Sequence, residues 1–244
     1  MNAAPTSAAP ASGAPASAAP AAAVAPADVP ARPLAPAAQA GDPASPVIVE
    51  WPLAWTEQRA ALTLEYRRRH HLATAEDLEI EPRVIVLHYT AGGSAKGTKA
   101  YFDRVTIEEG RAQLASAGRA NVSSHFLVDR DGTIYRLQPE TRFARHCIGL
   151  NHVAIGVENV GDEARWPLTE AQVTANIALV RHLVARFPVT HLLGHHEVMR
   201  FRAHSYYVER EPGYRNVKAD PGARFMERVR GALGDLSLAG PPEQ

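Results

Sequence analysis

The sequence predicts an α/β fold in which a mixed central β-sheet is flanked by helices, as a single domain behind an Ala/Pro-rich N-terminal segment. The first observation is the run Val-Ile-Val-Leu at 84–87, which is typical of a strand covered on both faces. The second is a capping-box signature at Thr169 and Gln172, after which apolar residues recur with helical spacing. The third is Asp131-Gly132 between two alternating segments, which indicates a β-hairpin with a two-residue turn.

Composition divides the 244-residue chain into three parts. Residues 1–46 are almost entirely Ala, Pro, Ser and Gly, so they cannot bury enough apolar surface to offset the entropy of ordering and are expected to form a disordered spacer. Residues 47–235 are expected to form one domain that is large enough to bury a substantial core. Residues 236–244 end in Gly-Pro-Pro-Glu-Gln and are expected to form a flexible tail.

Charge and hydropathy exclude several classes of partner. The 26 basic and 26 acidic residues cancel, and no basic stripe with interleaved aromatics is present, which argues against nucleic acid. No apolar run approaches the roughly 20 residues of a transmembrane helix, and the N-terminus lacks the regions of a secretory signal. The single Cys147 rules out an internal disulfide and does not indicate a compartment. Nothing in the sequence indicates an oligomeric state.

The other elements follow from local signals. Thr56 is expected to cap a helix that runs through Arg69, and the basic cluster at 67–71 is interpreted as a solvated helix end whose cations complement the helix dipole. A long loop is expected over 201–217. The further expected elements are a short helix over 99–105, strands over 123–129, 133–137, 153–160 and 190–193, and a final helix that opens near Pro221 and runs to about 233.

Four of these elements carry or adjoin a histidine or an acidic residue, the residue types that bind metal ions or transfer protons. His88 follows the strand at 84–87, Glu158 lies between apolar neighbours in a later strand, His195 or His196 follows a short strand, and Asp220 precedes the last helix. Two imidazoles and one carboxylate make the three-ligand set of a catalytic zinc site, whose fourth position is left for water. Such a site lowers the pKa of the water to about 7. Glu158 is the candidate base for the proton of that water.

Each residue also has a purely structural interpretation. A single histidine at the end of a strand is more often satisfied by packing than by a metal, and Asp220 is about as often an N-cap beside a proline as a ligand. Lys218 is more often a solvated cation, although it shares a face with Asp220 and could stabilise an oxyanion there. Arg200 stands where a His-Glu-x-x-His zinc protease has its second histidine. Spacing alone therefore predicts only a metallohydrolase.

Five short segments, taken together and in order, resemble a known family. They are VIVLHYTA at 84–91, NVSSHFLV at 121–128, AIGVEN at 154–159, GHHE at 194–197 and KADPG at 218–222. The set looks like the zinc-dependent N-acetylmuramoyl-L-alanine amidases, a family that also includes peptidoglycan recognition proteins and phage lysozyme-type amidases. The resemblance runs from about residue 56 to 232.

The resemblance implies a role for each candidate residue. It implies that His88, His195 and Asp220 hold one zinc ion, that Glu158 is the general base, and that Lys218 supports the tetrahedral intermediate. The second histidine directly follows glycine in the family pattern, which selects the first histidine of the pair at 195–196.

Two further histidines match positions that line the groove of the family. His125 and His146 are therefore expected to contact substrate, and a packing role or a supporting role behind the ligands is an equal alternative.

The implied activity is zinc-dependent hydrolysis of the amide bond between N-acetylmuramic acid and L-alanine in peptidoglycan or muropeptides, which makes cell-wall material the expected partner. The alternative is a recognition module that binds peptidoglycan without cutting it. Work in the cell envelope or periplasm is expected if a signal lies upstream, and recycling of fragments in the cytoplasm becomes credible if Met1 is the true start. The loop at 201–217 is longer than in compact members, which leaves the preferred muropeptide open.

Overall fold

The sheet of this protein is mixed, as the sequence predicts. The structure is a computed structural model that describes residues 45–242, so the predicted spacer lies outside the described residues except for its last two. The strands pair in the order β1-β4-β3-β5-β2-β6, and all neighbours are parallel except β3 and β4, which form an antiparallel hairpin. The strands are β1 (Ile48–Glu50), β2 (Val84–Tyr89), β3 (Phe126–Val128), β4 (Ile134–Arg136), β5 (Ala154–Asn159) and β6 (His191–Gly194).

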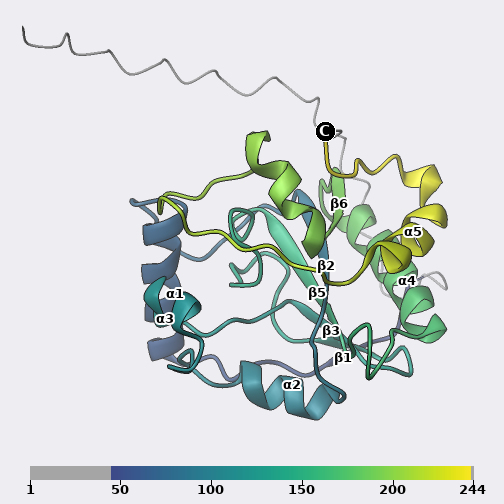
Figure 1. The fold of residues 1–244 in the computed structure, drawn as a ribbon, viewed down its shortest axis with the longest axis horizontal. Helices are drawn as coiled ribbons and strands as arrows, with labels where there is room; N and C mark the ends of the chain where they lie inside the picture. The colour runs from purple at the N-terminus through teal and green to yellow at the C-terminus, as the bar shows by residue number, and fades with distance from the viewer. Residues whose placement is uncertain (1–44, 243–244) are drawn as a thin grey trace, which may run out of the picture. The chain divides into compact units, whose positions relative to one another are not determined.

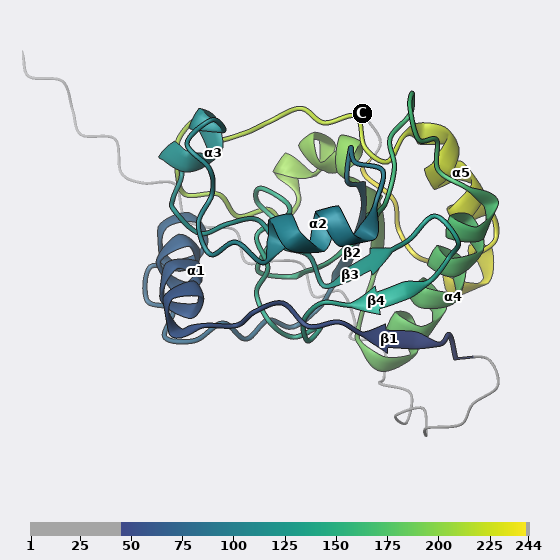
Figure 2. The ribbon, with the colours of Figure 1, turned by 90° about the horizontal axis from the view of Figure 1, so that it is seen from below.

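Helices flank this sheet in two groups. Figures 1 and 2 show α4 and α5 side by side on one side of the sheet, with α1, α2 and α3 away from them. No helix among residues 45–242 combines the length and the apolar character that crossing a membrane requires. The helices are α1 (Glu57–His70), α2 (Ala95–Phe102), α3 (Ala112–Ser116), α4 (Glu170–Arg186) and α5 (Ala223–Gly231), with 3₁₀ segments η1 (His195–Ala203) and η2 (Gly234–Leu236).

Strand β2 is covered on both faces, which confirms the interpretation of its β-branched run. Ile85 and Leu87 belong to the large core cluster that α4 and α5 complete, whereas Val84 and Val86 pack in a second cluster on the opposite face. All four side chains are fully buried, and each buried aliphatic side chain of this size stabilises the fold by roughly 1.5–3 kcal/mol. Because side chains alternate along a strand, His88 continues the face of Val84 and Val86, away from α4 and α5.

The capping box predicted for α4 is present and also fastens the helix to the sheet. The Thr169 hydroxyl accepts from the Gln172 backbone N–H at 3.2 Å, and the Gln172 side-chain oxygen accepts from the Thr169 N–H at 2.9 Å. The Gln172 amide nitrogen also donates to the carbonyl oxygens of Val128 and Val160, at 3.1 and 2.9 Å. The start of α4 is therefore held beside the carboxyl ends of β3 and β5.

The hairpin forms where the sequence predicts it, but its turn is longer than two residues. The Asp129 N–H donates to the Thr133 carbonyl oxygen at 2.9 Å, which leaves three residues in the loop. Gly132 closes that loop with a positive φ of 88°, a conformation that glycine adopts without strain. A three-residue loop with a left-handed last residue is the next common solution after the two-residue turns.

Helix α2 begins four residues before the expected start at 99 and ends at Phe102. The signal that the prediction missed is an N-cap, because the Ser94 hydroxyl accepts from the Gly97 N–H at 3.1 Å.

The chain end between 236 and 239 is ordered against the domain, contrary to the expected flexible tail from 236 onward. The Leu192 N–H donates to the Ala239 carbonyl oxygen at 3.0 Å, and the Ala239 N–H donates to the Thr190 carbonyl oxygen at 2.9 Å. Leu236 and Leu238 pack against the large core cluster. The physical reason is that β6 lies at the edge of the sheet, where unpaired backbone groups are available to a further extended segment.

Candidate active site

Three of the predicted site residues converge on one point. His88 lies near the carboxyl end of β2, His195 is the first residue after β6, and Asp220 lies shortly before α5. Their facing atoms form a small triangle: His88 Nδ1 to His195 Nδ1 is 2.9 Å, His88 Nδ1 to Asp220 Oδ2 is 3.1 Å, and His195 Nδ1 to Asp220 Oδ2 is 3.0 Å. Since β2 and β6 are parallel neighbours, their carboxyl ends bring the two histidines to the same edge of the sheet.

The size and chemistry of this triangle fit one divalent ion. Tetrahedral zinc with bonds of about 2.0–2.1 Å keeps its ligand atoms roughly 3.3 Å apart, close to the 2.9–3.1 Å found here. All three residues are buried, with exposures of 2% for His88 and 8% for both His195 and Asp220. Buried lone pairs that face one another are costly unless a proton or cation lies between them.

The protonation states of the cluster also suit a cation. Burial and, after it, the neighbouring His88 lower the pKa of His195 to about 4, although Asp220 opposes the shift. Burial alone would raise the pKa of Asp220, but its close contacts with His195 and His88 outweigh it and hold that pKa well below its usual range. Near neutral pH the cluster therefore offers a neutral imidazole and an ionised carboxylate, the forms that bind metal.

His146 fixes which nitrogen of His88 faces the cluster. The Nε2 of His146 lies 3.2 Å from the Ala154 carbonyl oxygen, an acceptor, so this nitrogen carries a proton. Burial, and then the neighbouring His88, lower the pKa of His146 well below its usual value, which leaves its Nδ1 as an acceptor. That Nδ1 lies 3.0 Å from His88 Nε2, which must therefore donate. The Nδ1 lone pair of His88 is then free to face His195 and Asp220.

His125 lies behind the site and not in it. Its side chain is fully buried, its Nε2 donates to the Arg142 carbonyl oxygen at 2.8 Å, and its Nδ1 accepts from the Gly156 N–H at 2.9 Å. Both ring nitrogens are thus used by the backbone. This placement favours the packing alternative over contact with substrate, and it holds β5 two residues before Glu158. His146, in contrast, both supports His88 and lines the cavity described below.

Glu158 stands beside the triangle without belonging to it. In the parallel register of β2 and β5 it is paired with His88, and it points to the face opposite Ile155 and Val157. Its Oε2 is buried and has no hydrogen-bond partner within residues 45–242. Burial is the main cause that raises the pKa of Glu158 to about 7, while His88 opposes the shift and Asp220 adds to it. A carboxyl group with such a pKa is suited to exchange protons near neutrality.

Lys218 reaches the same cavity from the segment before α5. Asn216, Lys218 and Asp220 all line the cavity, whereas Val217 and Ala219 between them are exposed. This is the alternation expected of an extended segment, and it places the ammonium group on the same side as the Asp220 carboxylate. His196 turns elsewhere, with its Nδ1 3.1 Å from the backbone oxygen of Asp220.

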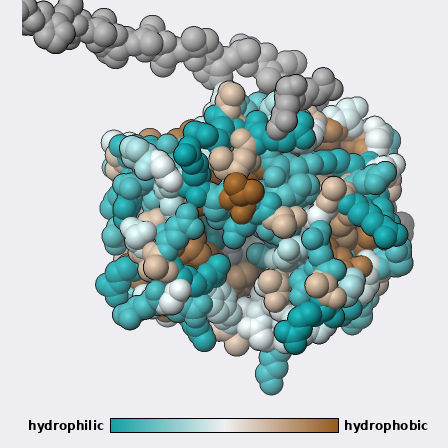
Figure 3. Space-filling view, in the orientation of Figure 1, coloured by the Kyte–Doolittle hydropathy of each residue, from teal (hydrophilic) through white to brown (hydrophobic). Residues whose placement is uncertain are grey.

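The cluster opens into a cavity of about 430 Å³. Figure 3 shows a largely hydrophilic face that is hollowed near its centre. The cavity wall away from the triangle is formed by aromatic and cationic side chains, which include Tyr66, Tyr101, Arg111, Arg145 and Tyr214.

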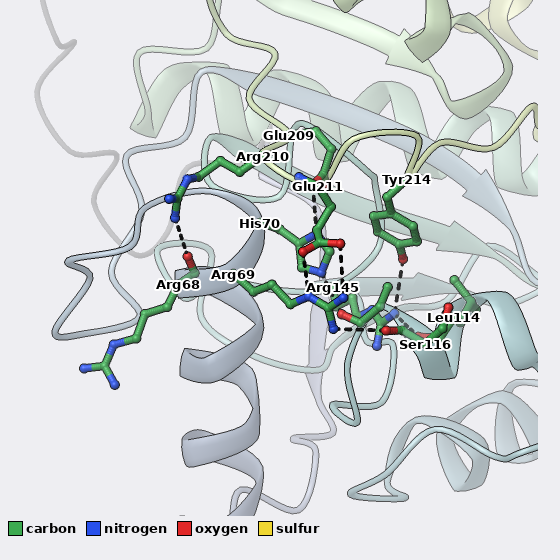
Figure 4. A network of polar contacts seen from close by, with 11 residues as sticks. Arg68, Arg69, His70, Leu114, Ser116, Arg145, Glu209, Arg210, Glu211 and Tyr214 are labelled. Atoms are coloured by element: carbon green, nitrogen blue, oxygen red, sulfur yellow. Dashed lines mark hydrogen bonds and ion pairs between the residues drawn. The ribbon is translucent and has the colours of Figure 1, made fainter.

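The loop at 201–217 forms part of the wall of this cavity. It is attached to the end of α1, as Figure 4 shows. Glu209 Oε1 lies 2.8 Å from His70 Nδ1, and both side chains are buried. Beside this pair, Arg69 forms an ion pair with Glu211 at 3.1 Å whose side chains are 40% and 39% exposed. The basic end of α1 is therefore a docking point for the loop, and the interpretation as a solvated helix end is wrong for the buried His70.

The same loop contributes Tyr214 to the cavity. Its hydroxyl accepts from Arg145 at 3.1 Å, and Arg145 also donates to the Leu114 carbonyl oxygen at 2.7 Å (Figure 4). A further bond from Arg145 reaches the Ala120 carbonyl oxygen at 2.6 Å. Tyr207 packs instead against the hydrophobic cluster to which the buried apolar side chains of η1 belong. The loop is thus partly a wall of the cavity and partly a packed insertion.

Three asparagines position the site, and sequence reasoning assigned them no role. The Asn159 amide donates to the His88 carbonyl oxygen at 3.0 Å, and Asn176 of α4 donates to Asn159 at 2.6 Å. Asn151 accepts from the N–H groups of His146 and Cys147 at 2.9 and 2.7 Å. Asn159 lies in one of the five segments noted above, which was the one available signal; Asn151 and Asn176 gave none.

Comparisons with known proteins show which family the chain resembles. Residues 78–223 match the model of the N-acetylmuramoyl-L-alanine amidase family. The endolysin of Escherichia phage T7 is 32% identical over 111 residues, which are 43% of this chain and 74% of the endolysin. Peptidoglycan-recognition protein SC2 of Drosophila melanogaster is 28% identical over 116 residues, 46% of this chain, and the matched part spans 62% of that protein.

Among solved structures, the N-acetylmuramoyl-L-alanine amidase LysC of Clostridium intestinale has a similar fold. The two chains superpose with a TM-score of 0.52 at 25% sequence identity, over 78% of this chain and 99% of that one. The family match covers more than half of the chain and includes all three residues of the triangle together with Glu158 and Lys218. The chain therefore belongs to the N-acetylmuramoyl-L-alanine amidase family.

Proposed function

We propose that this protein is a zinc-dependent N-acetylmuramoyl-L-alanine amidase, which hydrolyses the amide bond between the lactyl group of N-acetylmuramic acid and L-alanine of the stem peptide. The observation that carries the proposal is the convergence of two imidazole nitrogens and one carboxylate oxygen, 2.9–3.1 Å apart, in a cavity that Glu158 also lines, whose Oε2 has no hydrogen-bond partner within the described residues. His88, His195 and Asp220 would hold the ion.

Zinc bound there would supply a Lewis acid for the scissile carbonyl group and would acidify an attacking water. The other contributions belong to the chain itself. Glu158, with its buried and partnerless Oε2, accepts a proton from the water as the water oxygen attacks the carbonyl carbon. Lys218 places a positive charge in the same cavity, where it stabilises the negative charge that develops on the carbonyl oxygen.

The second half of the reaction uses the same carboxyl group in the opposite direction. Protonated Glu158 delivers its proton to the amide nitrogen as the carbon–nitrogen bond breaks, which releases the amino group of L-alanine and leaves on the lactyl group a carboxylic acid that then loses its proton to solvent. In the metal-free protein burial raises the pKa of Glu158 to about 7, so this carboxyl group is more easily protonated than an ordinary glutamate, as the second transfer requires.

A non-catalytic peptidoglycan-binding module is the second candidate, favoured by the similarity to peptidoglycan-recognition protein SC2. Such a module needs no complete ligand set and no base. The presence of all three candidate ligands and Glu158 in one cavity supports the enzyme over the module.

The deciding experiment follows the release of stem peptide from purified muropeptides by mass spectrometry, with zinc added and after chelation. We expect release by the wild type with zinc, and loss of release in Glu158→Gln. Glu227→Gln, on the exposed face of α5, is the matched control and should remain active. Full turnover by Glu158→Gln would remove the base assignment. Retention of peptidoglycan without cleavage, in the presence of zinc, would favour the binding module.

The place where the protein works and the substrate that it prefers are linked questions. We propose either the cell envelope, if a leader is removed from the natural protein, or recycling of soluble fragments in the cytoplasm. Sequencing the N-terminus of the protein isolated from cell fractions separates the two, and a panel of intact sacculi and soluble fragments shows which substrate is preferred.

A further inference from the structure

A partly buried ion pair joins η1, which begins with His195, to α5, which follows Asp220. The carboxylate of Glu197 receives two hydrogen bonds from the guanidinium of Arg230, at 2.7 and 2.5 Å, and one from the Gly194 N–H at 2.7 Å. Glu197 is only 8% exposed. Both carboxylate oxygens of Glu197 are matched by guanidinium nitrogens of Arg230, which is the arrangement of an ion pair. Bidentate pairs of this kind fix geometry as well as charge.

The pair connects the two segments that carry His195 and Asp220. Glu197 belongs to η1, and its bond to the Gly194 N–H closes the turn in which His195 lies. Arg230 belongs to the last turn of α5, the helix that begins three residues after Asp220. Arg230 also donates to the Leu192 carbonyl oxygen in β6 at 2.6 Å. One guanidinium thus holds the end of β6, the start of η1 and the helix that follows Asp220.

The backbone joins the same segments close to the ligands. The His196 N–H donates to the Asp220 carbonyl oxygen at 2.8 Å. A single backbone hydrogen bond permits the two segments to rotate about it, whereas a second connection, through Glu197 and Arg230, prevents that rotation. Metal ligands must be held within about 0.5 Å of their productive positions by such supporting contacts.

We propose that Glu197 and Arg230 are positioning residues that set the distance between His195 and Asp220 and thereby the affinity of the site for zinc. This inference rests on the proposed zinc site. Arg230 lies beyond residues 78–223, the part of the chain that matches the family. The Glu197–Arg230 pair therefore adds to the site Arg230, a residue outside the part of the chain that matches the family.

A merely structural ion pair would stabilise the fold without changing zinc affinity, and the chain offers such a pair as a control. Arg181 of α4 holds both carboxylate oxygens of Asp235, at 2.6 and 2.8 Å, and also donates to the Ala232 carbonyl oxygen at 2.8 Å. This pair has the same bidentate geometry and also ends on the segment after α5, but it touches neither ligand-bearing turn. Asp235→Asn is thus the matched control for Glu197→Gln.

The experiment measures the zinc dissociation constant of metal-free protein by competition with a chromogenic chelator, beside the urea midpoint of the same samples. Loss of supporting contacts typically costs metal sites 10- to 100-fold, so we expect roughly that weakening in Glu197→Gln and a smaller one in Arg230→Lys. The double variant Glu197→Gln/Arg230→Met leaves no buried charge unpaired. It should therefore unfold near the wild-type midpoint and still bind zinc weakly. Asp235→Asn should bind zinc like the wild type.

Two results would overturn the inference while leaving the proposed function intact. One is zinc affinity within about twofold of the wild type in both Glu197→Gln and the double variant, beside normal hydrolysis by the wild type. The other is an equal loss of affinity in Asp235→Asn. Failure of the wild type to bind zinc would overturn the proposed function and the inference together.

Discussion

Replacing His146 should weaken zinc binding although this residue is not among the ligands. Its Nδ1 accepts from His88 Nε2 at 3.0 Å, and this contact selects the tautomer in which the His88 Nδ1 faces His195 and Asp220. Without the acceptor, His88 can carry its proton on the nitrogen that binds the ion, and that proton must be moved before binding.

The magnitude follows from the burial of the contact. His88 is 2% exposed, so an unpaired ring N–H there costs about 1–3 kcal/mol. Since about 1.4 kcal/mol corresponds to a tenfold change in an equilibrium constant, the leucine variant His146→Leu should bind zinc roughly 5- to 150-fold more weakly. His146→Asn keeps an acceptor near the position of Nδ1 and should recover part of the loss.

Competition with a chelator on the metal-free proteins measures the effect, with the urea midpoint recorded on the same samples. Both substitutions disturb packing against Gly156, whose neighbour in space is the His146 ring. A difference in zinc affinity between the two variants therefore reports the acceptor and not the packing. Equal zinc affinity in the wild type and His146→Leu would refute the tautomer argument.

Three further results are expected. Glu158→Gln should lower kcat by about 10²–10⁴-fold while zinc content stays at the wild-type level, which kinetics and metal analysis of the same preparation check; a loss of zinc would instead place Glu158 among the ligands. In the metal-free protein burial raises the pKa of Glu158 to about 7 from 4.5, so the folded state holds this proton more tightly than the unfolded state. The stability gained is fully present below about pH 4.5 and is lost as the pH rises to about 7, by about 3 kcal/mol, so urea unfolding of Glu158→Gln should show a flatter pH profile in that window. Glu209→Ala should lower the free energy of unfolding by about 1–3 kcal/mol, because it leaves the buried Nδ1 of His70 without its partner, whereas Glu211→Ala breaks an exposed pair and should change little in the same urea assay.

The elements that the sequence predicts well are those whose signal is local. The β-branched run of β2 and the capping box of α4 each indicate an element from only a few residues, and both elements are found as predicted. The start of α2 depends on the single Ser94 cap, which a helix-period search overlooks. The attachment of Ala239 to β6 depends on an edge that exists only after the sheet has formed.

The candidate site shows the same division. The residue types at the ends of separate strands predicted only a metal site with His88 as one ligand, whereas the choice of His195 over His196 and the inclusion of Asp220 came from the family resemblance. Their supports could not be predicted, since Arg230 approaches Glu197 across 33 residues and nothing in either local sequence indicates the contact. The contact between Glu209 and His70, which are 139 residues apart in the chain, could not be predicted from the sequence for the same reason.

The central claim is that His88, His195 and Asp220 hold one zinc ion, and the zinc content of two adjacent histidine variants tests it most directly. Metal analysis of purified wild type, His195→Ala and His196→Ala separates a ligand from its neighbour, since only His195 enters the triangle. The expected result is one zinc per chain in the wild type and in His196→Ala, and none in His195→Ala. Undiminished zinc in His195→Ala would contradict the account.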